Sequence, residues 1–216
     1  MPKIQITEDG SHTLFSEMAG QTYHSSHGAV QESRHIFISQ LSIVNSQRSI
    51  VITPSAELVS LRQGDNIKGT FSVLEIGFGT GLNALLTAQW ARENGVRVEY
   101  TTIELYPLGC EVYRELNYGC LLGDEELFLK LHEAEWDAGF VQVSECFAIR
   151  KCKSDIVGWV TDAQCTMHNT QLMDLSYSTL YSLYDVVYFD AFITSFIIFS
   201  LLVVFVLILF HNCLFF

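Results

Sequence analysis

Basic residues are scarce in this sequence of 216 residues. It holds 12 Lys and Arg against 24 Asp and Glu, which gives a formal net charge of -12. Proteins that bind nucleic acid contact its phosphates through Lys and Arg, so this balance gives no support for such a surface. The apolar fraction of 49% excludes a disordered chain, and the length suffices for one domain with its own core.

Signatures of metal binding and of secretion are also missing. None of the six cysteines forms a C-x-x-C pair, and none is spaced with a histidine as in a zinc knuckle. We therefore expect reduced thiols and no bound metal. The N-terminus lacks the basic-then-apolar pattern of a signal peptide, and we expect a cytoplasmic location.

Charged residues are absent from the segment 192–216, which is apolar and long enough to span a bilayer. No Lys or Arg follows Lys153, however, so the basic flank that anchors a membrane span is missing. We expect a truncated or frame-shifted end, with C-terminal strands of the fold missing and one sheet edge left open. The alternatives are a membrane anchor through 192–216 and a buried final pair of strands.

Hydrophobic patterning predicts an α/β fold with a parallel sheet, because strands and helices alternate along the middle of the chain. We divide the sequence into an N-terminal extension with hairpin character (1–50), an incomplete α/β domain (51–191) and the apolar tail (192–216). Within the helix expected at 83–94, the apolar spacing indicates one buried face. We also expect a turn at 8–11 and a helix that begins within 32–41. Further helices are expected at 55–69, 107–117 and 125–136. Strands are expected at 71–76, 98–103 and 184–189, and strand-like runs occur at 140–143 and 156–160.

The motif Gly77-Phe78-Gly79-Thr80-Gly81 lies between an expected strand and an expected helix. Glycines let the backbone turn sharply and approach a ligand closely, and a helix N-terminus offers free N–H groups. The spacing differs from that of dinucleotide-binding enzymes, because Leu82-Asn83-Ala84 follows where a further glycine is expected. Glu75 precedes the loop, and Glu104 ends the next strand, where a carboxylate can accept both hydroxyls of a ribose.

Two further acids are candidates for the site. Asp190 follows a later strand, at the edge where α/β sheets bind ligands, and a carboxylate there can orient an amine nucleophile. Asp174 is a candidate for a position near an adenine ring. The alternatives are a helix cap or turn for Asp190 and a solvated strand end for Glu104.

These segments together resemble a known family, the methyltransferase of MnmC/MnmD-type tRNA wobble-uridine modification. The strings that carry the resemblance keep the family's order over residues 9–192. They are DGSHTL (9–14), YHSSHGAVQESRHIFI (23–38), VLEIGFGTGLN (73–83), ELYPL (104–108), LHEAEW (131–136) and YDVVYFDAF (184–192).

The resemblance implies a class I S-adenosylmethionine-dependent methyltransferase with a Rossmann-like parallel sheet. Its substrate would be the aminomethyl group of a wobble uridine in tRNA, with Asp190 beside the reacting amine. The YHS and ESRH segments would line the pocket, although surface histidines are an equal reading of His24 and His27. The implied cofactor-binding residues are Glu75, Gly77, Phe78, Gly79, Thr80, Gly81, Asn83, Glu104 and Asp174.

The likeness stops after Phe192, where the family continues with Ala-Pro and this chain reads Ile193-Thr194-Ser195-Phe196. We therefore expect a poor or inactive enzyme. The alternatives are a non-catalytic or degenerate cofactor-binding protein, with or without attachment to a membrane, and a nicotinamide-dependent oxidoreductase.

Overall fold

The computed structural model describes residues 2–17, 19–48, 68–156, 158–159 and 184–189. Asp174, Asp190, the tail 192–216 and most of the helix expected at 55–69 lie outside the described residues. None of the helices within the described ranges is long and apolar enough to cross a membrane.

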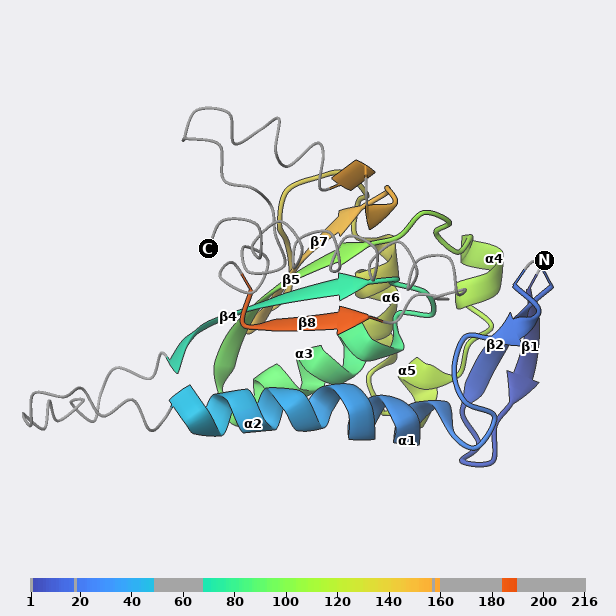
Figure 1. Ribbon diagram of the computed structural model, residues 1–216, viewed down its shortest axis with the longest axis horizontal. Coiled ribbons are helices and arrows are strands. Elements are labelled where there is room, and N and C mark those ends of the chain that lie inside the picture. The colour runs from blue at the N-terminus through green and yellow to red at the C-terminus, as the bar shows by residue number, and fades with distance from the viewer. Residues whose placement is uncertain (1, 18, 49–67, 157, 160–183, 190–216) are drawn as a thin grey trace, which may run out of the picture.

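A five-stranded sheet forms the centre of the fold, with the strand order β6-β7-β5-β4-β8 (Figure 1). Four neighbouring strands run parallel, and the edge strand β6 is antiparallel to β7. The α/β fold with a mostly parallel, Rossmann-like sheet is therefore confirmed. The strands are β4 (Lys68–Ile76), β5 (Val96–Ile103), β6 (Val141–Ser144), β7 (Phe147–Cys152) and β8 (Val186–Phe189).

The strand order reverses at β4. The chain passes from β4 to β5 and β7 on one side, and then returns to place β8 on the other side of β4. Ligands of open α/β sheets bind outside the carboxyl ends of the strands at such a switch point. The edge near Ile76 and Phe189, which are paired in register, is therefore the place to look for a site.

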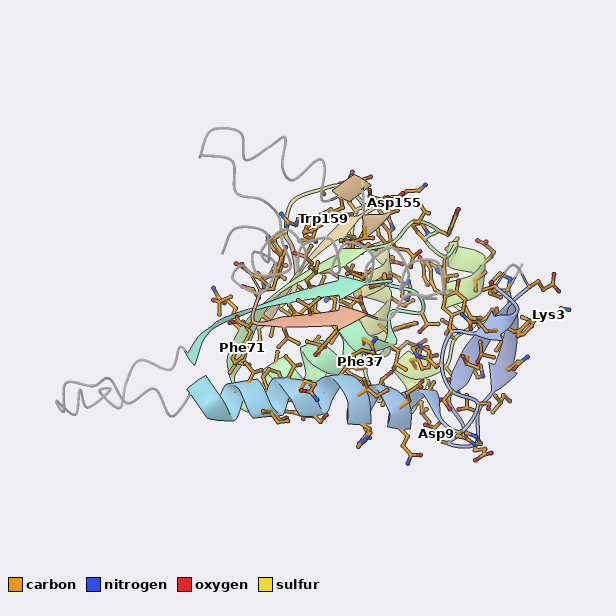
Figure 2. The ribbon with its side chains drawn as sticks, in the orientation of Figure 1. Lys3, Asp9, Phe37, Phe71, Asp155 and Trp159 are labelled. Atoms are coloured by element: carbon orange, nitrogen blue, oxygen red, sulfur yellow. The ribbon has the colours of Figure 1, made fainter. Side chains whose placement is uncertain are left out.

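The N-terminal helical segment and α3 lie on one face of this sheet (Figure 1). A continuous helical segment from the N-terminal region lies beside α3, and its last part contacts β8. Phe37 and Phe71 lie in the core between this helical layer and the sheet (Figure 2). The helices are α1 (Ala29–Ser33), the π-helical turn η1 (Arg34–Ile38), α2 (Ser39–Arg48), α3 (Leu82–Asn94), α4 (Cys110–Tyr113), α5 (Tyr118–Leu121) and α6 (Glu125–Glu133).

The opposite face of the sheet carries a second, smaller cluster. Leu74, Ile76 and Ile103 form it, and Trp159 packs against them on this face (Figure 2). The side chains of β4 and β5 thus alternate between the two cores, as the two-residue period of a strand requires.

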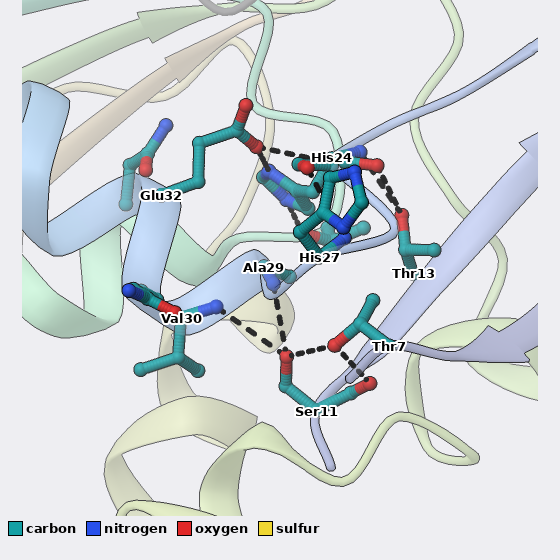
Figure 3. A network of polar contacts seen from close by, with 12 residues as sticks. Thr7, Ser11, Thr13, His24, His27, Ala29, Val30 and Glu32 are labelled. Atoms are coloured by element: carbon teal, nitrogen blue, oxygen red, sulfur yellow. Dashed lines mark hydrogen bonds and ion pairs between the residues drawn. The ribbon is translucent and has the colours of Figure 1, made fainter. Parts of the chain in front are cut away.

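The N-terminal hairpin confirms the turn expected at 8–11 and also holds the start of α1. Its strands are β1 (Lys3–Ile6), β2 (His12–Ser16) and β3 (Gln21–Thr22). The Asp9 carboxylate accepts a hydrogen bond from the Gln31 N–H at 3.0 Å, and the Ser11 hydroxyl accepts one from the Ala29 N–H at 3.1 Å (Figure 3). The turn therefore satisfies free N–H groups at the helix N-terminus, which α1 cannot satisfy itself.

Several expected elements are wrong in extent. Lys68 is not helical but pairs with Val96 at the start of β4. The second helix is only α4, because Gly109 is extended and the helix begins after it. The third helix ends at Glu133, since Ala134 leaves the helical conformation. At 156–160, the described residues Ile156, Gly158 and Trp159 are helical rather than extended.

The single buried face expected for the helix at 83–94 is also wrong. Nine residues of α3 are buried, including Asn83 and Thr87, because α1, η1 and α6 pack against this helix in addition to the sheet. The N-terminal region and α3 therefore share one core.

Candidate functional site

The glycine loop follows β4 directly, at the switch point of the sheet. Gly77, Gly79 and Gly81 have φ angles of 96°, 49° and 73°, a region that L side chains rarely adopt. Gly81 is also the N-cap of α3. The three glycines thus fold the chain back on itself, and the free N–H groups of α3 face the carboxyl edge of the sheet.

Glu104 lies beside this loop, one residue after β5. One carboxylate oxygen accepts a hydrogen bond from the Gly79 N–H at 3.0 Å, and the other accepts one from the Tyr106 N–H at 2.8 Å. The Glu104 side chain is half-buried. A carboxylate has about four acceptor positions, so roughly two remain for the hydroxyls of a ligand.

Glu75 and Asn83 meet beneath the loop. Glu75 is completely buried and accepts hydrogen bonds from the Thr102 hydroxyl at 2.8 Å and the Asn83 amide at 3.3 Å. This network joins β4, β5 and the first turn of α3. A buried carboxylate is tolerated only where such donors compensate its lost hydration, so these residues fix the base of the loop.

The N-terminal segment packs against the same loop. A Cβ added to Gly79 would lie 3.2 Å from the Tyr23 ring, so that ring covers the loop backbone. Burial and the negative charge of Glu104 raise the pKa of Tyr23, which keeps its phenol neutral. The neighbouring His24 is buried, and its Nε2 lies 2.8 Å from the Thr80 hydroxyl.

A second histidine contacts the loop from α6. His132 Nε2 lies 3.1 Å from the Thr80 carbonyl oxygen, and its ring stacks on Tyr113 with the centroids 4.3 Å apart. The Lys151 ammonium donates to the His132 carbonyl at 2.6 Å and lies over the Trp136 ring. Burial lowers the pKa of Lys151 to about 8.

The predicted cofactor residues within the described chain therefore lie together, but they do not all present side chains to a ligand. The side chains of Glu75, Phe78, Thr80 and Asn83 are buried, whereas Gly77 and Glu104 are partly exposed. Gly77 of the loop and the Glu104 carboxylate are thus the groups that a ligand can reach.

The positions of Asp174 and Asp190 lie outside the described residues. β8 ends at Phe189, which pairs with Ile76 next to the glycine loop, and Asp190 is the next residue in the sequence. Within the described part of the chain, no group of three His, Cys, Asp or Glu side chains is placed to hold a metal ion.

Sequence reasoning assigned no role to Tyr113, His132 or Lys151. The burial of Lys151 could have been predicted, because it lies two residues after Ile149 and four after Phe147, on the side of β7 that faces the core. A lysine at an inward position of a strand calls for buried acceptors, which the carbonyls at the end of α6 supply.

The fold and this loop define the chain as an α/β protein with a Rossmann-like sheet and a candidate ligand site at its switch point. No protein-family model matches the sequence. Curated relatives called tRNA 5-methylaminomethyl-2-thiouridine biosynthesis bifunctional protein MnmC do match it. The relative from Leptospira interrogans is 31% identical over 108 residues, which is 49% of this chain and 14% of the relative. The relative from Pseudomonas fluorescens is 31% identical over 111 residues, which is 50% of this chain and 15% of the relative.

The chain thus contains an MnmC-like domain, and the resemblance read from its sequence motifs is confirmed. The match covers only about one-seventh of the length of these relatives. A crystal structure of MnmC2 from Aquifex aeolicus has a TM-score of 0.49 and 22% identity, covering 75% of this chain and 45% of that chain.

Proposed function

We propose that the chain binds S-adenosylmethionine at the glycine loop and belongs to a methyltransferase that acts on the aminomethyl group of a tRNA wobble uridine. The main support for the proposal is the hydrogen bond that the Gly79 N–H donates to the Glu104 carboxylate at 3.0 Å. This bond places a carboxylate with free acceptor positions beside a tight glycine turn at the switch point of the sheet. The similarity to MnmC proteins supports the choice of substrate.

The residues present fit an adenosyl group. The remaining acceptor positions of Glu104 suit the two ribose hydroxyls, and the loop lets a ligand approach the backbone at Gly77 closely. Leu105 and Tyr106 are exposed apolar side chains directly after Glu104, which suits a flat aromatic base. Bound S-adenosylmethionine would supply an electrophilic methyl group on its sulfonium.

We assign the handling of the amine to Asp190. A carboxylate accepts a hydrogen bond from the neutral amine, orients its lone pair and takes the proton that is released on methylation. Asp190 follows β8 in sequence, and β8 lies beside β4. The net charge of -12 does not favour tRNA, so the proposal of this partner depends on the similarity to relatives.

The first test is a calorimetric titration of the full-length chain with S-adenosylmethionine, S-adenosylhomocysteine and NAD. We expect saturable binding of both adenosyl ligands and no comparable binding of NAD. Preferred binding of NAD would instead favour a nicotinamide-dependent oxidoreductase.

The second test is methyl transfer from labelled S-adenosylmethionine to tRNA that carries an unmethylated aminomethyl group. We expect only weak labelling of the tRNA by the wild-type chain, because its likeness to the family stops after Phe192, and none with Asp190→Ala. Binding of the cofactor without any transfer would overturn the proposed activity and indicate a cofactor-binding protein without catalysis.

A further inference from the structure

Thr80 stands at the centre of the glycine loop and is 1% exposed. Two elements far apart in the sequence contact it from different sides. His24, 56 residues earlier, reaches its hydroxyl, and His132, 52 residues later, reaches its carbonyl oxygen. The loop is therefore linked both to the N-terminal region and to the end of α6.

The direction of one of these hydrogen bonds follows from chemistry alone. A carbonyl oxygen can only accept, so His132 must carry a proton on Nε2 and donate it to Thr80 at 3.1 Å. Burial lowers the pKa of His132 to about 3 and that of His24 to about 4, so both imidazoles are neutral near pH 7. The hydrogen bond between the Thr80 hydroxyl and His24 Nε2 can run in either direction, because a hydroxyl can donate or accept and the role of the ring nitrogen depends on the tautomer.

Each histidine is itself held in place. The backbone N–H of His24 donates to the Thr13 hydroxyl at 2.9 Å, that hydroxyl donates to the backbone carbonyl of His24 at 3.3 Å, and the His24 side chain is buried. His132 is stacked on Tyr113 with an interplanar angle of 14°, and Lys151 holds its carbonyl. The two imidazoles therefore form fixed contacts rather than rotating freely at a surface.

The loop has no room to move relative to His132. A Cβ added to Gly81 would lie 2.7 Å from His132 Nε2 and 3.1 Å from the Phe78 ring. The loop backbone thus packs directly against the imidazole. A shift of the imidazole would move Thr80 and the backbone on both sides of it, including the Gly79 N–H that is bonded to Glu104.

We propose that His24 and His132 are positioning residues that hold Thr80 by its hydroxyl and its carbonyl and thereby set the glycine-loop backbone for the adenosyl cofactor. Neither imidazole has a role in the methyl-transfer step itself. The proposal rests on the proposed function in one respect, namely that the ligand of the loop is an adenosyl compound. It adds that the N-terminal region and α6 control the affinity for that ligand.

The experiment compares two substitutions at each histidine. His132→Phe keeps a ring that can stack on Tyr113 but removes the donor, whereas His132→Gln keeps a donor near the position of Nε2. His24→Phe and His24→Gln form the matching pair. His27→Phe is the control, because His27 lies in the same N-terminal segment with its side chain 81% exposed.

The first readout is the affinity for S-adenosylhomocysteine, measured by calorimetry on the full chain. We expect the two Phe variants to bind about ten-fold more weakly, the typical effect of a buried acceptor or donor left unpaired. The Gln variants should stay within about three-fold of wild type, and His27→Phe should bind as wild type does. Folded Phe variants with unchanged affinity would overturn the proposal.

The second readout is independent of any ligand and of variant stability. In the wild-type chain, nitrogen-detected NMR of His132 should show the proton on Nε2, protected from exchange with solvent. A proton on Nδ1 instead would overturn the proposal. Hydrogen exchange of the Gly79 and Gly81 amides should accelerate in folded Phe variants beyond any change in the sheet, and a uniform change would indicate a general loss of stability instead.

These two readouts separate the proposals. If the wild-type chain binds no adenosyl ligand, the proposed function fails, and the NMR and exchange measurements alone decide whether the histidines hold the loop. If the ligand binds equally to all folded variants, the proposed function stands and the positioning role is wrong.

Discussion

At the scale of single residues, the candidate site depends on backbone conformations that side chains disfavour. Gly79 combines a φ of 49° with an aromatic ring 3.2 Å from the place where a Cβ would stand. Gly123 has a similar φ of 70° but open space around that place. Substitutions at the two glycines can therefore be compared: at Gly123 a side chain meets only backbone strain, whereas at Gly79 it also meets the neighbouring ring.

We predict that Gly79→Val abolishes binding of S-adenosylmethionine. A β-branched side chain disfavours this φ by about 1–3 kcal/mol and would also push against Tyr23, so the loop must change shape. Calorimetry checks the affinity, with Gly123→Val as the matched control that carries backbone strain alone. Equal affinity in wild type and Gly79→Val would show that the loop is not the binding element.

We also predict that Glu104→Ala weakens binding of the cofactor by roughly 1.5–3 kcal/mol, the usual effect of losing charge-assisted hydrogen bonds. The substitution removes the acceptors assigned to the ribose and also frees the Gly79 N–H. Glu99→Ala, at an exposed position of β5, is the control. Should the affinity of Glu104→Ala equal that of wild type, Glu104 would be a solvated strand end.

At the scale of elements, the N-terminal hairpin and α1 act as one unit. Asp9 accepts hydrogen bonds from Thr7, Ser11 and Gln31, and so joins the turn to the helix. Burial alone would raise the pKa of Asp9, but these hydrogen bonds lower it to about 2. The charged carboxylate therefore stabilises the fold above pH 4, and this contribution is lost as the pH falls towards 2.

We predict that Asp9→Ala lowers the free energy of unfolding by about 1–2 kcal/mol at pH 7, the range known for a lost N-cap. Urea unfolding followed by circular dichroism checks this value. Glu8→Ala is a matched control, because Glu8 is adjacent but forms only a surface pair with His27. A loss in Glu8→Ala as large as that in Asp9→Ala would contradict the capping role.

The elements that the sequence predicted well are those with an uninterrupted local pattern. The strands expected at 71–76, 98–103 and 184–189 correspond to β4, β5 and β8, and the glycine loop follows β4 as expected. β7 was not recognised, because Arg150 and Lys151 interrupt its apolar run. The buried acceptors that make Lys151 tolerable come from α6, about 20 residues away, and no local pattern shows them.

The sequence predicted the glycine loop and Glu104, but it did not predict the contacts that hold the loop from beneath. Gly77–Gly81 and Glu104 follow from the alternation of strands and helices, since consecutive parallel strands end at the same edge. The contacts of Thr80 with His24 and His132 bridge more than 50 residues in each direction. Such long-range contacts depend on the packing of whole elements, which spacing along the chain does not reveal.

At the scale of the whole molecule, the N-terminal region is part of the main core rather than an appendage. Leu14, Phe37 and Leu41 belong to the same apolar cluster as Val73 of β4 and Tyr188 of β8. The two histidines that hold the glycine loop lie in this shared interior. Protonation of either imidazole would therefore affect both the stability of the fold and the conformation of the glycine loop.

This link gives a prediction for acid pH. An unfolded chain binds protons on His24 and His132 near pH 6.5, whereas the folded chain does so only near pH 4 and pH 3. Between these values the unfolded state binds more protons, so the contribution of the two histidines to the free energy of unfolding falls as the pH falls below about 6.5 and is constant above it.

Urea unfolding at pH 7.0, 6.0 and 5.0 tests this prediction, in a range that lies above the ordinary pKa of carboxyl groups at about 4. We expect the wild-type chain to lose stability steadily over this range, because each buried imidazole resists the protonation that its unfolded form undergoes. The double variant His24→Gln/His132→Gln should show a much shallower dependence, since Gln does not titrate, whereas His27→Gln should keep the wild-type slope. Equal slopes in wild type and the double variant would mean that the two imidazoles are not buried in the folded protein, and the interior around Thr80 would then be open to water.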